Sequence, residues 1–411
     1  MTTEYIDTLI VGGGQAGLAQ SEHLVNFTVP HIILEKDRIA ESWRTARWDS
    51  LVTNGPVWHD RFPTLEFSGI SPNGFATKER VVAYLEEVAQ KINAPIRCGV
   101  EVKHLYKESV TNLWVAKTTS GIIKALNVVV ATGPFQSPVI PNIIPRTRWI
   151  TQIHSRDYRN PEQLPDGAVL VVGSGSSGAQ IAEELLLANR AVYLSIGPHD
   201  RPPRSYRGHD YCWWLGVLGK WAAKAPQPGT EHLTIAVSGA YGGKTVDFRR
   251  FAANGMQLLG MTREFKDGHL YLEPDLRKNL NRGDSNYLSV LSEADNYIVE
   301  NNLDLPTEEE ARIMYPDPAC VTDPILDLNL TEAGIKSVVW ATGFVQDFSW
   351  MKANVFSDDG RPNHDCGISN EPGIYFLGLP WLSMRGSSFI WGVWQDAKHI
   401  AEHIAKRKRD L

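Results

Sequence analysis

The sequence predicts an α/β fold in which one nucleotide-binding domain is interrupted by a second domain of the same design. An apolar, strand-like run followed by Gly-x-Gly-x-x-Gly occurs twice, at residues 8–19 and 168–182, and each copy continues into a helix-like pattern. The phrase Ala-Thr-Gly also occurs twice, at 131–133 and 341–343, where the chain would pass between two domains. A strand, a glycine-rich turn and a helix in this order are typical of Rossmann-like dinucleotide-binding domains.

Length and composition agree with such an arrangement. A chain of 411 residues with 43% hydrophobic residues can form two or three domains with hydrophobic cores. We expect the first domain at 1–150 plus 335–411 and the second at 151–334, with an insertion from about residue 205 that lines the substrate site. The net charge of -6 offers no general attraction to nucleic acid, which binds basic faces.

The sequence pattern gives no sign of a membrane span or an oxidising compartment. Apolar runs such as 128–131 are far shorter than the roughly 20 residues that cross a bilayer. Residues 1–7 lack the basic region of a signal peptide. The cysteines at 98, 212, 320 and 366 form neither a CxxC motif nor a metal-ligand spacing. We expect a cytoplasmic protein without metal, membrane or nucleic-acid partners, and the sequence leaves a homodimer open.

The first glycine turn predicts a site for a nucleotide without a 2′-phosphate. In such a turn the first glycine forms the bend, the second admits a pyrophosphate, and the third lets the helix pack on the strand. The next strand ends at Glu35, 23 residues after Gly12, where an acidic side chain binds the adenosine ribose. The alternative is an ordinary glycine-rich turn. The candidate ligands are Gly12, Gly14, Gln15, Ala16, Gly17, Glu35 and Lys36.

The second turn predicts NADPH rather than NADH. Its following strand ends at the neutral Ser195, 22 residues after Gly173, and cations follow at Arg201, Arg204 and Arg207. A neutral residue followed by cations suits a 2′-phosphate. The arginines could instead belong to a solvated loop or contact the substrate. The candidate ligands are Gly173, Gly175, Ser176, Ser177, Gly178, Ser195, Arg201 and Arg204.

The remaining elements are predicted coarsely. Thr77 caps an expected amphipathic helix at 78–89, and strands are expected at 97–106, 113–118 and 122–130. The two Ala-Thr-Gly phrases, with Thr132, Gly133, Thr342 and Gly343 as candidate cofactor-binding residues, mark the domain crossings.

Two further segments make the chain resemble a class B, flavin-containing monooxygenase, over nearly its whole length. Residues 49–56 read Asp-Ser-Leu-Val-Thr-Asn-Gly-Pro, and the resemblance implies that Asn54 lies beside the flavin and the nicotinamide. Trp43 stands where the family often has a tryptophan lining the isoalloxazine, although it could be a core residue. The resemblance is strongest to the small bacterial branch that is related to the plant auxin-forming monooxygenases.

The identifying sequence of that family, FxGxxxHxxx(Y/F), is partly present. His154 and Tyr158 match, whereas Arg148 and Ile150 replace the phenylalanine and glycine. The resemblance implies that His154 positions the nicotinamide domain; otherwise it is a satisfied interdomain histidine. Tyr158 in place of tryptophan argues against a Baeyer-Villiger enzyme.

The C-terminal segment resembles the last strand and turn beneath the flavin. Gly378 and Ser388 are its candidate cofactor contacts, and a helix at about 392–405 would direct its amides at the pyrimidine ring. His399, Glu402 and His403 match the zinc pattern HxxEH, which also arises on a solvated helix face, so no metal site is predicted.

The resemblance implies FAD in the first domain and NADPH in the second, with O2 and a small organic molecule as substrates. It implies N-, S- or C-oxygenation through a C4a-(hydro)peroxyflavin, with Asn54 as the catalytic residue. Seven aromatic residues are expected either to line a substrate pocket or to belong to the core of the domain. They are Tyr206, Tyr211, Trp213, Trp214, Trp221, Tyr241 and Phe248. The alternatives are an NADPH-dependent flavin reductase or diaphorase and a non-enzymatic nucleotide-sensing protein.

Overall fold

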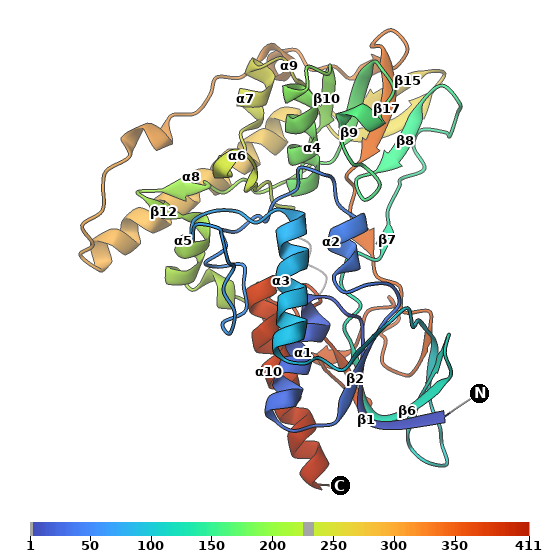
Figure 1. Cartoon of the computed structure of the whole chain (residues 1–411). Helices are drawn as coiled ribbons and strands as arrows, with labels where there is room; N and C mark the ends of the chain where they lie inside the picture. The colour runs from blue at the N-terminus through green and yellow to red at the C-terminus, as the bar shows by residue number, and fades with distance from the viewer. Residues whose placement is uncertain (1–2, 225–233, 411) are drawn as a thin grey trace.

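The computed structural model describes residues 3–224 and 234–410 and contains two sheets with parallel cores (Figure 1). In the first sheet, β1 (Thr3–Val11) lies between β2 (His31–Glu35) and β6 (Ile122–Val130), and both pairings are parallel. The sheet continues through β3 (Ile96–Cys98) on one side and the antiparallel β5 (Trp114–Thr118) and β4 (Val102–Lys107) on the other. The predicted strand at 97–106 is therefore two strands.

Segments from the C-terminal part of the chain complete the first sheet. β22 (Ile374–Phe376) pairs in parallel with β6, and β19 (Met351–Lys352) pairs with β4. The short strands β20 (His364–Asp365) and β21 (Ile368–Ser369) lead to β22. Through this pairing the chain returns to the first sheet after the second one.

Three helices pack together beside the first sheet (Figure 1). They are α1 (Gln15–Asn26), α3 (Lys78–Lys91) and α10 (Ile390–Asp410). Thr77 caps α3 as predicted, because its Oγ1 accepts a hydrogen bond from the amide of Arg80. Buried residues of β1 and β6 belong to one hydrophobic cluster with apolar residues of α1 and α10, so the returning C-terminal helix is part of the first core.

The second sheet is parallel throughout and has the strand order β13-β10-β9-β17-β8. Its strands are β8 (Thr151–His154), β9 (Ala168–Val172), β10 (Val192–Ser195), β13 (Gln257–Leu259) and β17 (Ile335–Trp340). The predicted boundary at 335 is corrected here, because β17 pairs with both β9 and β8. The chain crosses back after β17, at the second Ala-Thr-Gly phrase.

The crossing itself is a small two-stranded sheet. β7 (Ser137–Pro138) pairs with β18 (Phe344–Val345), each following one Ala-Thr-Gly phrase. The short helix α2 (Glu41–Thr45) lies near this crossing in Figure 1. The two phrases, which the sequence predicted as domain crossings, are therefore neighbours in space.

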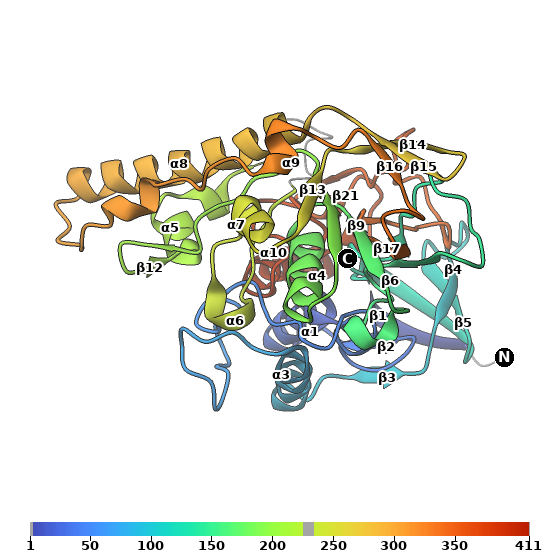
Figure 2. The same cartoon turned by 90° about the horizontal axis from the view of Figure 1, so that it is seen from above.

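The predicted insertion contains its own helices and two small sheets. Helix α4 (Ser176–Leu187) belongs to the second domain, and the insertion adds α5 (Tyr211–Val217), α6 (Ala240–Gly243), α7 (Phe248–Ala253), α8 (Leu276–Glu300) and α9 (Ala319–Thr322). A hairpin forms from β11 (Ser205–Tyr206) and β12 (His209–Asp210), and a sheet from β14 (Thr262–Lys266), β15 (His269–Leu272) and β16 (Asp327–Asn329). Three single 3-10 turns lie at Pro161–Gln163, Lys220–Ala222 and Glu309–Arg312. Figure 2 shows α8 extending away from the second sheet, with α5 and β12 beside it.

The aromatic residues that the sequence predicted as substrate lining or domain core occupy different environments in the structure. Tyr206, Trp214 and Phe248 are at most 2% exposed and belong to hydrophobic cores, which the sequence left as the alternative. Tyr241 is exposed. Within residues 3–224 and 234–410, no helix is both long enough and apolar enough to cross a membrane.

Candidate active site

The first glycine turn is built so that only glycine fits two of its positions. Gly12 has φ +117°, and a Cβ there would lie 2.4 Å from the carbonyl oxygen of Ala131. A Cβ on Gly17 would lie 1.9 Å from the carbonyl oxygen of Gly12. A Cβ on Gly14 would meet no atom within 4 Å. The turn is therefore closed on its strand side and open at Gly14, where a pyrophosphate can approach the start of α1.

The end of β2 closes this turn from the other side. Glu35 accepts hydrogen bonds from the amide of Gly13 (2.7 Å) and from the amide of Asp37 (2.9 Å). Both bonds fix the carboxylate beside the glycine turn, at the position where a ribose-binding acid is expected. Lys36 is exposed next to it. Their contacts with an adenosine ribose stay a prediction.

The predicted C-terminal contacts meet the start of α1. The side-chain amide of Gln15 donates to the carbonyl oxygen of Ser388 (2.9 Å). A Cβ on Gly378 would lie 2.9 Å from the Cβ of Ala16. Residues more than 360 positions apart in the chain thus lie against the first glycine turn. The geometry of this cradle fits a dinucleotide bound along the carboxyl end of the first sheet.

The second glycine turn repeats this construction. Gly173 has φ +118°, a Cβ there would lie 2.4 Å from the carbonyl oxygen of Ala341, and a Cβ on Gly178 would lie 1.9 Å from the carbonyl oxygen of Gly173. Residues 234–238 pass over the start of α4, where Ser176 donates to the carbonyl of Ile235 (2.9 Å). Gly175 faces the same segment, and Ser177 follows at the start of the helix. The second turn is more covered than the first.

The prediction that Arg201 and Arg204 bind a 2′-phosphate is corrected by their surroundings. Both are 3% exposed, and each pairs with a carboxylate: Arg201 with Asp284 (2.7 Å) and Arg204 with Asp210 (2.5 Å). Arg207 pairs in turn with Asp295 (2.9 Å). A buried guanidinium is stable only when paired, so these side chains anchor the insertion. Ser195 is also buried, and its hydroxyl donates to the carbonyl of Gly260 (2.9 Å).

His154 has both ring nitrogens bonded to backbone groups. Nδ1 accepts from the amide of Arg156 (3.1 Å), which leaves the ring proton on Nε2 to be donated to the carbonyl of Gly343 (3.0 Å). Burial lowers the pKa of His154, which keeps the ring neutral. The arrangement favours the interdomain histidine over a direct cofactor contact, because neither nitrogen is left for a ligand.

The remaining crossing residues are also held by the protein. Gln136 donates from its side-chain amide to Thr132 Oγ1 (3.0 Å) and to the carbonyl of Gly133 (2.8 Å). Thr342 donates to the carbonyl of Val139. Trp43 packs against the cores of both domains, so it lies at their junction, and its contact with an isoalloxazine stays a prediction.

A cavity of about 50 Å³ lies between the two domains. The first domain contributes Asn54, Gly55, His59, Asp60, Arg385 and Phe389 to its lining, and the second contributes Arg204, Tyr211, Cys212, Leu215, Trp221, Ile235 and Val237. Tyr211 and Trp221 belong to the aromatic group that the sequence predicted as lining. Sequence reasoning missed His59, Asp60 and Arg385, although His59 and Asp60 lie only a few residues after Asn54.

The side chain of Asn54 is fixed across the domain boundary. The amide nitrogen of Gln180, on α4, donates both to the carbonyl of Val237 (3.0 Å) and to Asn54 Oδ1 (2.8 Å). Because a backbone carbonyl can only accept, this pair assigns the nitrogen of Gln180 and therefore the oxygen of Asn54. Arg204 also donates to the backbone carbonyl of Asn54. Nδ2 of Asn54 donates to no group among the described residues, so it can donate to a molecule in the cavity.

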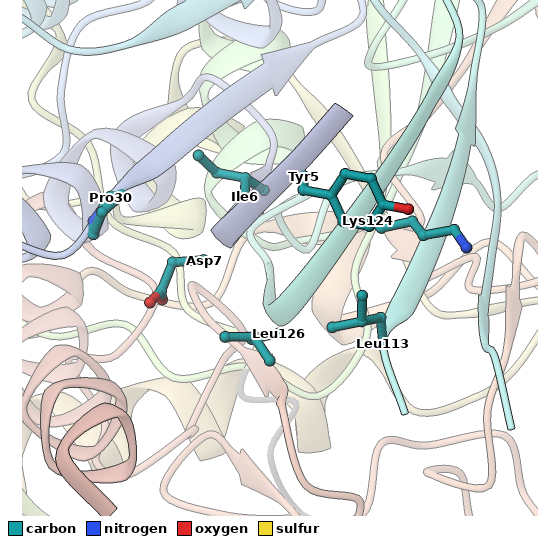
Figure 3. A pocket seen from close by; sticks show the side chains of 7 residues that line it. All are labelled: Tyr5, Ile6, Asp7, Pro30, Leu113, Lys124 and Leu126. Atoms are coloured by element: carbon teal, nitrogen blue, oxygen red, sulfur yellow. The ribbon is translucent and has the colours of Figure 1, made fainter. Parts of the chain in front are cut away.

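A wider groove of about 420 Å³ lies elsewhere, as Figure 3 shows. Tyr5, Ile6 and Asp7 line it from the first half of β1, together with Lys124. Ligands of parallel α/β sheets bind at the carboxyl ends of the strands, and the glycine turn follows the other end of β1. The groove is therefore separate from the nucleotide sites.

The zinc-like pattern near the C-terminus lies on α10. In the described ranges, no group of three His, Cys, Asp or Glu residues could hold a metal ion. His403 Nδ1 lies 3.0 Å from the hydroxyl of Tyr375, and Glu402 pairs with Lys398 (2.9 Å).

Acidification is expected to destabilise the protein through His199, which is 1% exposed on the loop after β10. Burial lowers the pKa of His199 to about 4, compared with 6.5 for an exposed histidine. The pKa of His199 is lower in the folded protein than in the unfolded chain. The contribution of neutral His199 to the free energy of unfolding is therefore present above pH 6.5 and is lost as the pH falls toward 4. A shift of this size corresponds to about 3 kcal/mol.

Urea denaturation at several pH values measures this effect. The free energy of unfolding should fall less steeply between pH 6.5 and 4 in His199→Gln than in the wild type. Identical slopes would assign the acid sensitivity to other groups.

Comparisons with known proteins identify the family. The profile described as pyridine nucleotide-disulphide oxidoreductase matches residues 9–210. The uncharacterized oxidoreductase CzcO-like of Geobacillus kaustophilus is 34% identical over 403 residues, which cover 97% of this chain and 98% of that protein. The probable indole-3-pyruvate monooxygenase YUCCA9 of Arabidopsis thaliana is 30% identical over 421 residues, which cover 98% of this chain and 89% of the relative. The chain belongs to the flavin-containing monooxygenase family.

Structure agrees with this assignment at the level of the fold. The flavin-containing monooxygenase from Stenotrophomonas maltophilia matches with a TM-score of 0.67 and 17% identity over 98% of this chain and 99% of that one. Flavin-containing monooxygenases use FAD and NADPH, so the chain is an FAD- and NADPH-dependent enzyme of the monooxygenase type. The turn at Gly14 is open on one side, with Glu35 and Ser388 near it. That this turn binds FAD and the turn at Gly173 binds NADPH stays a prediction.

Proposed function

We propose that the enzyme uses NADPH and O2 to oxygenate a small organic molecule bound in the cavity beside Asn54. The arrangement that carries this proposal is the position of Asn54, which lines the cavity and is bonded to Gln180 on the helix of the second glycine turn. Asn54 belongs to the first nucleotide-binding domain and is hydrogen-bonded to the second, so the binding of either cofactor can affect its position. FAD supplies the chemistry, because it accepts hydride from NADPH and activates O2.

The residues of the cavity provide placement and water exclusion. Asn54 Nδ2 would donate a hydrogen bond to the reacting groups, while Gln180 and Arg204 hold the asparagine in place. Leu215, Trp221 and Phe389 supply apolar walls. A closed, largely apolar site protects a reactive oxygen species from water. The small volume suits a small substrate.

Replacing Asn54 with alanine should uncouple NADPH oxidation from oxygenation. The loss of one hydrogen bond worth about 1.4 kcal/mol changes the ratio of oxygenation to H2O2 release about tenfold. The yield of product per NADPH should therefore fall about tenfold while H2O2 release rises. The measurement is incorporation of label from ¹⁸O2 into product, together with NADPH consumption and H2O2. Asn301→Ala, at the exposed end of α8, is the matched control and should stay coupled.

Full coupling in Asn54→Ala would remove the asparagine from the mechanism. A wild type that oxidises NADPH but places no ¹⁸O in any product, across a panel of small amines, sulfides and ketones, would favour the flavin reductase instead.

A further inference from the structure

His59 and Asp60 form a buried pair on the wall of the interdomain cavity. His59 Nδ1 lies 2.7 Å from Asp60 Oδ1, and the side chains are 8% and 10% exposed. The other carboxylate oxygen of Asp60 accepts a hydrogen bond from the amide of Gly55 (3.0 Å), the residue after Asn54. The pair is therefore attached directly to the segment that carries the proposed catalytic asparagine.

This bonding pattern fixes the tautomer of His59. A carboxylate that accepts from Gly55 also accepts from His59, so Nδ1 carries a proton, and in the neutral ring Nε2 carries the free lone pair. Nε2 is buried and has no hydrogen-bond partner in the part of the chain that the structure describes. A buried nitrogen without a partner is costly, which indicates that a ligand of the cavity satisfies it.

Aromatic rings hold the imidazole in one orientation. Trp221 stacks on His59 with a centroid distance of 4.9 Å and an interplanar angle of 25°, and Trp391 packs at 5.1 Å. The two rings come from different domains, so both domains contribute to the position of His59. Such support is typical of a preorganised proton acceptor.

The other ionisable groups that line the cavity leave His59 as the available base. Arg204 is paired with Asp210, burial raises the pKa of Cys212 and keeps it a thiol, and burial raises the pKa of Tyr211 to about 12. Arg385, which lies near the Tyr211 hydroxyl (3.4 Å), is a cation. At neutral pH none of these four can accept a proton from a substrate.

We propose that His59 takes a proton from the substrate and that Asp60 is its positioning residue, which fits an amine that arrives as its ammonium ion. This inference rests on the proposed monooxygenase function. An ammonium nitrogen has no lone pair for oxygen transfer until the N–H bond breaks and Nε2 receives the proton. The overall change is R2NH2⁺ + NADPH + O2 → R2NOH + NADP⁺ + H2O. An N–O bond forms, O2 and NADPH supply the oxygen and the hydride, and the proton held by His59 ends in water.

Two probes with the same carbon skeleton test this assignment. Dimethylamine is an ammonium ion near neutral pH, whereas dimethyl sulfide has no proton to lose. In the FAD-loaded His59→Gln protein at pH 7.5, kcat/KM for dimethylamine should fall about 100-fold, as is usual for loss of a general base. The loss of kcat/KM with dimethyl sulfide should be at least about tenfold smaller than the loss with dimethylamine, since its sulfur needs no base.

A pH profile separates proton transfer from a structural role. The amine activity of His59→Gln should recover as the pH rises and free dimethylamine accumulates, while wild-type activity changes less. Asp60→Asn should also lose more activity with dimethylamine than with dimethyl sulfide, but its loss of kcat/KM for the amine should be smaller than that of His59→Gln. His209→Gln is the matched control, because His209 also stacks on a tryptophan, Trp213 at 3.9 Å, and does not line the cavity. FAD content and the anaerobic rate of reduction by NADPH verify that each variant is intact.

The outcomes distinguish this inference from the proposed function. Equal losses with both probes, or no loss with the amine, would overturn the role of His59. A wild type that oxygenates dimethyl sulfide but not dimethylamine would overturn the inference and leave the monooxygenase function standing. A wild type that oxygenates neither probe would count against both.

Discussion

Replacing Gly17 with alanine is expected to give a protein that cannot fold correctly around FAD. The new Cβ would lie 1.9 Å from the carbonyl oxygen of Gly12 and 3.4 Å from Ile10 Cγ2. The first contact is with backbone, so it can be relieved only if α1 moves away from β1. Overpacking of this kind costs about 3 kcal/mol or more. We expect a lower free energy of unfolding in urea and almost no flavin absorbance in the purified protein.

Gly14→Ala is the matched comparison within the same turn. Its Cβ would meet no protein atom within 4 Å, so the protein should fold with wild-type stability. The methyl group would nevertheless occupy the open side of the turn, where a pyrophosphate approaches. Stable protein with weakened FAD binding is the expected result. Wild-type FAD affinity in Gly14→Ala, or a wild-type melting curve in Gly17→Ala, would contradict this account of the turn.

The second large effect is expected from Asp284→Asn, on α8. Asp284 accepts from Arg201 through Oδ1 and from Arg249 through Oδ2, and these arginine side chains are 4% and 7% exposed. The substitution keeps the shape but removes the negative charge between two buried cations. Breaking a buried ion pair from one side costs about 3–5 kcal/mol. Urea denaturation should show a loss of this size.

A neighbouring position on α8 provides the control for Asp284. Ser285 is exposed and bonds only to its own helix, so Ser285→Ala should change stability by less than about 0.5 kcal/mol. Equal stability of Asp284→Asn and the wild type would mean that the arginines find other partners, such as Asp247 (3.6 Å from Arg201).

The glycine turns could be predicted from the sequence because backbone geometry leaves few residue choices. Gly12 and Gly173 have nearly equal φ angles, and each faces the carbonyl of the alanine that opens an Ala-Thr-Gly phrase. A constraint of this kind is local, and it appears as a spacing of glycines that can be recognised without the fold. The same holds for Thr77, whose capping bond reaches only three residues along the chain.

The roles of Arg201 and His154 could not be predicted in the same way, because their partners are distant in sequence. Arg201 follows the strand where a phosphate ligand is expected, but its carboxylate partner, Asp284, lies 83 residues further on. His154 matches a family motif, while its acceptor Gly343 lies 189 residues away. The domain boundary predicted at residue 335 differs from the structure for a related reason, because only strand pairing assigns β17 to the second sheet.

The cavity was the least predictable part of the site. Asn54 was found by resemblance, but His59, Asp60 and Arg385 become significant only when two domains bring them together. A histidine beside an aspartate is common in sequences, and the feature that distinguishes this one is its unpartnered, buried Nε2.

Rapid mixing of the NADPH-reduced, FAD-loaded protein with oxygenated buffer distinguishes a monooxygenase from a flavin reductase. A monooxygenase should show a transient absorbance band that belongs to neither reduced nor oxidised flavin and that decays faster when a substrate is present. Immediate return of the oxidised spectrum with stoichiometric H2O2, unchanged by any substrate of the panel, would contradict the proposed monooxygenase function.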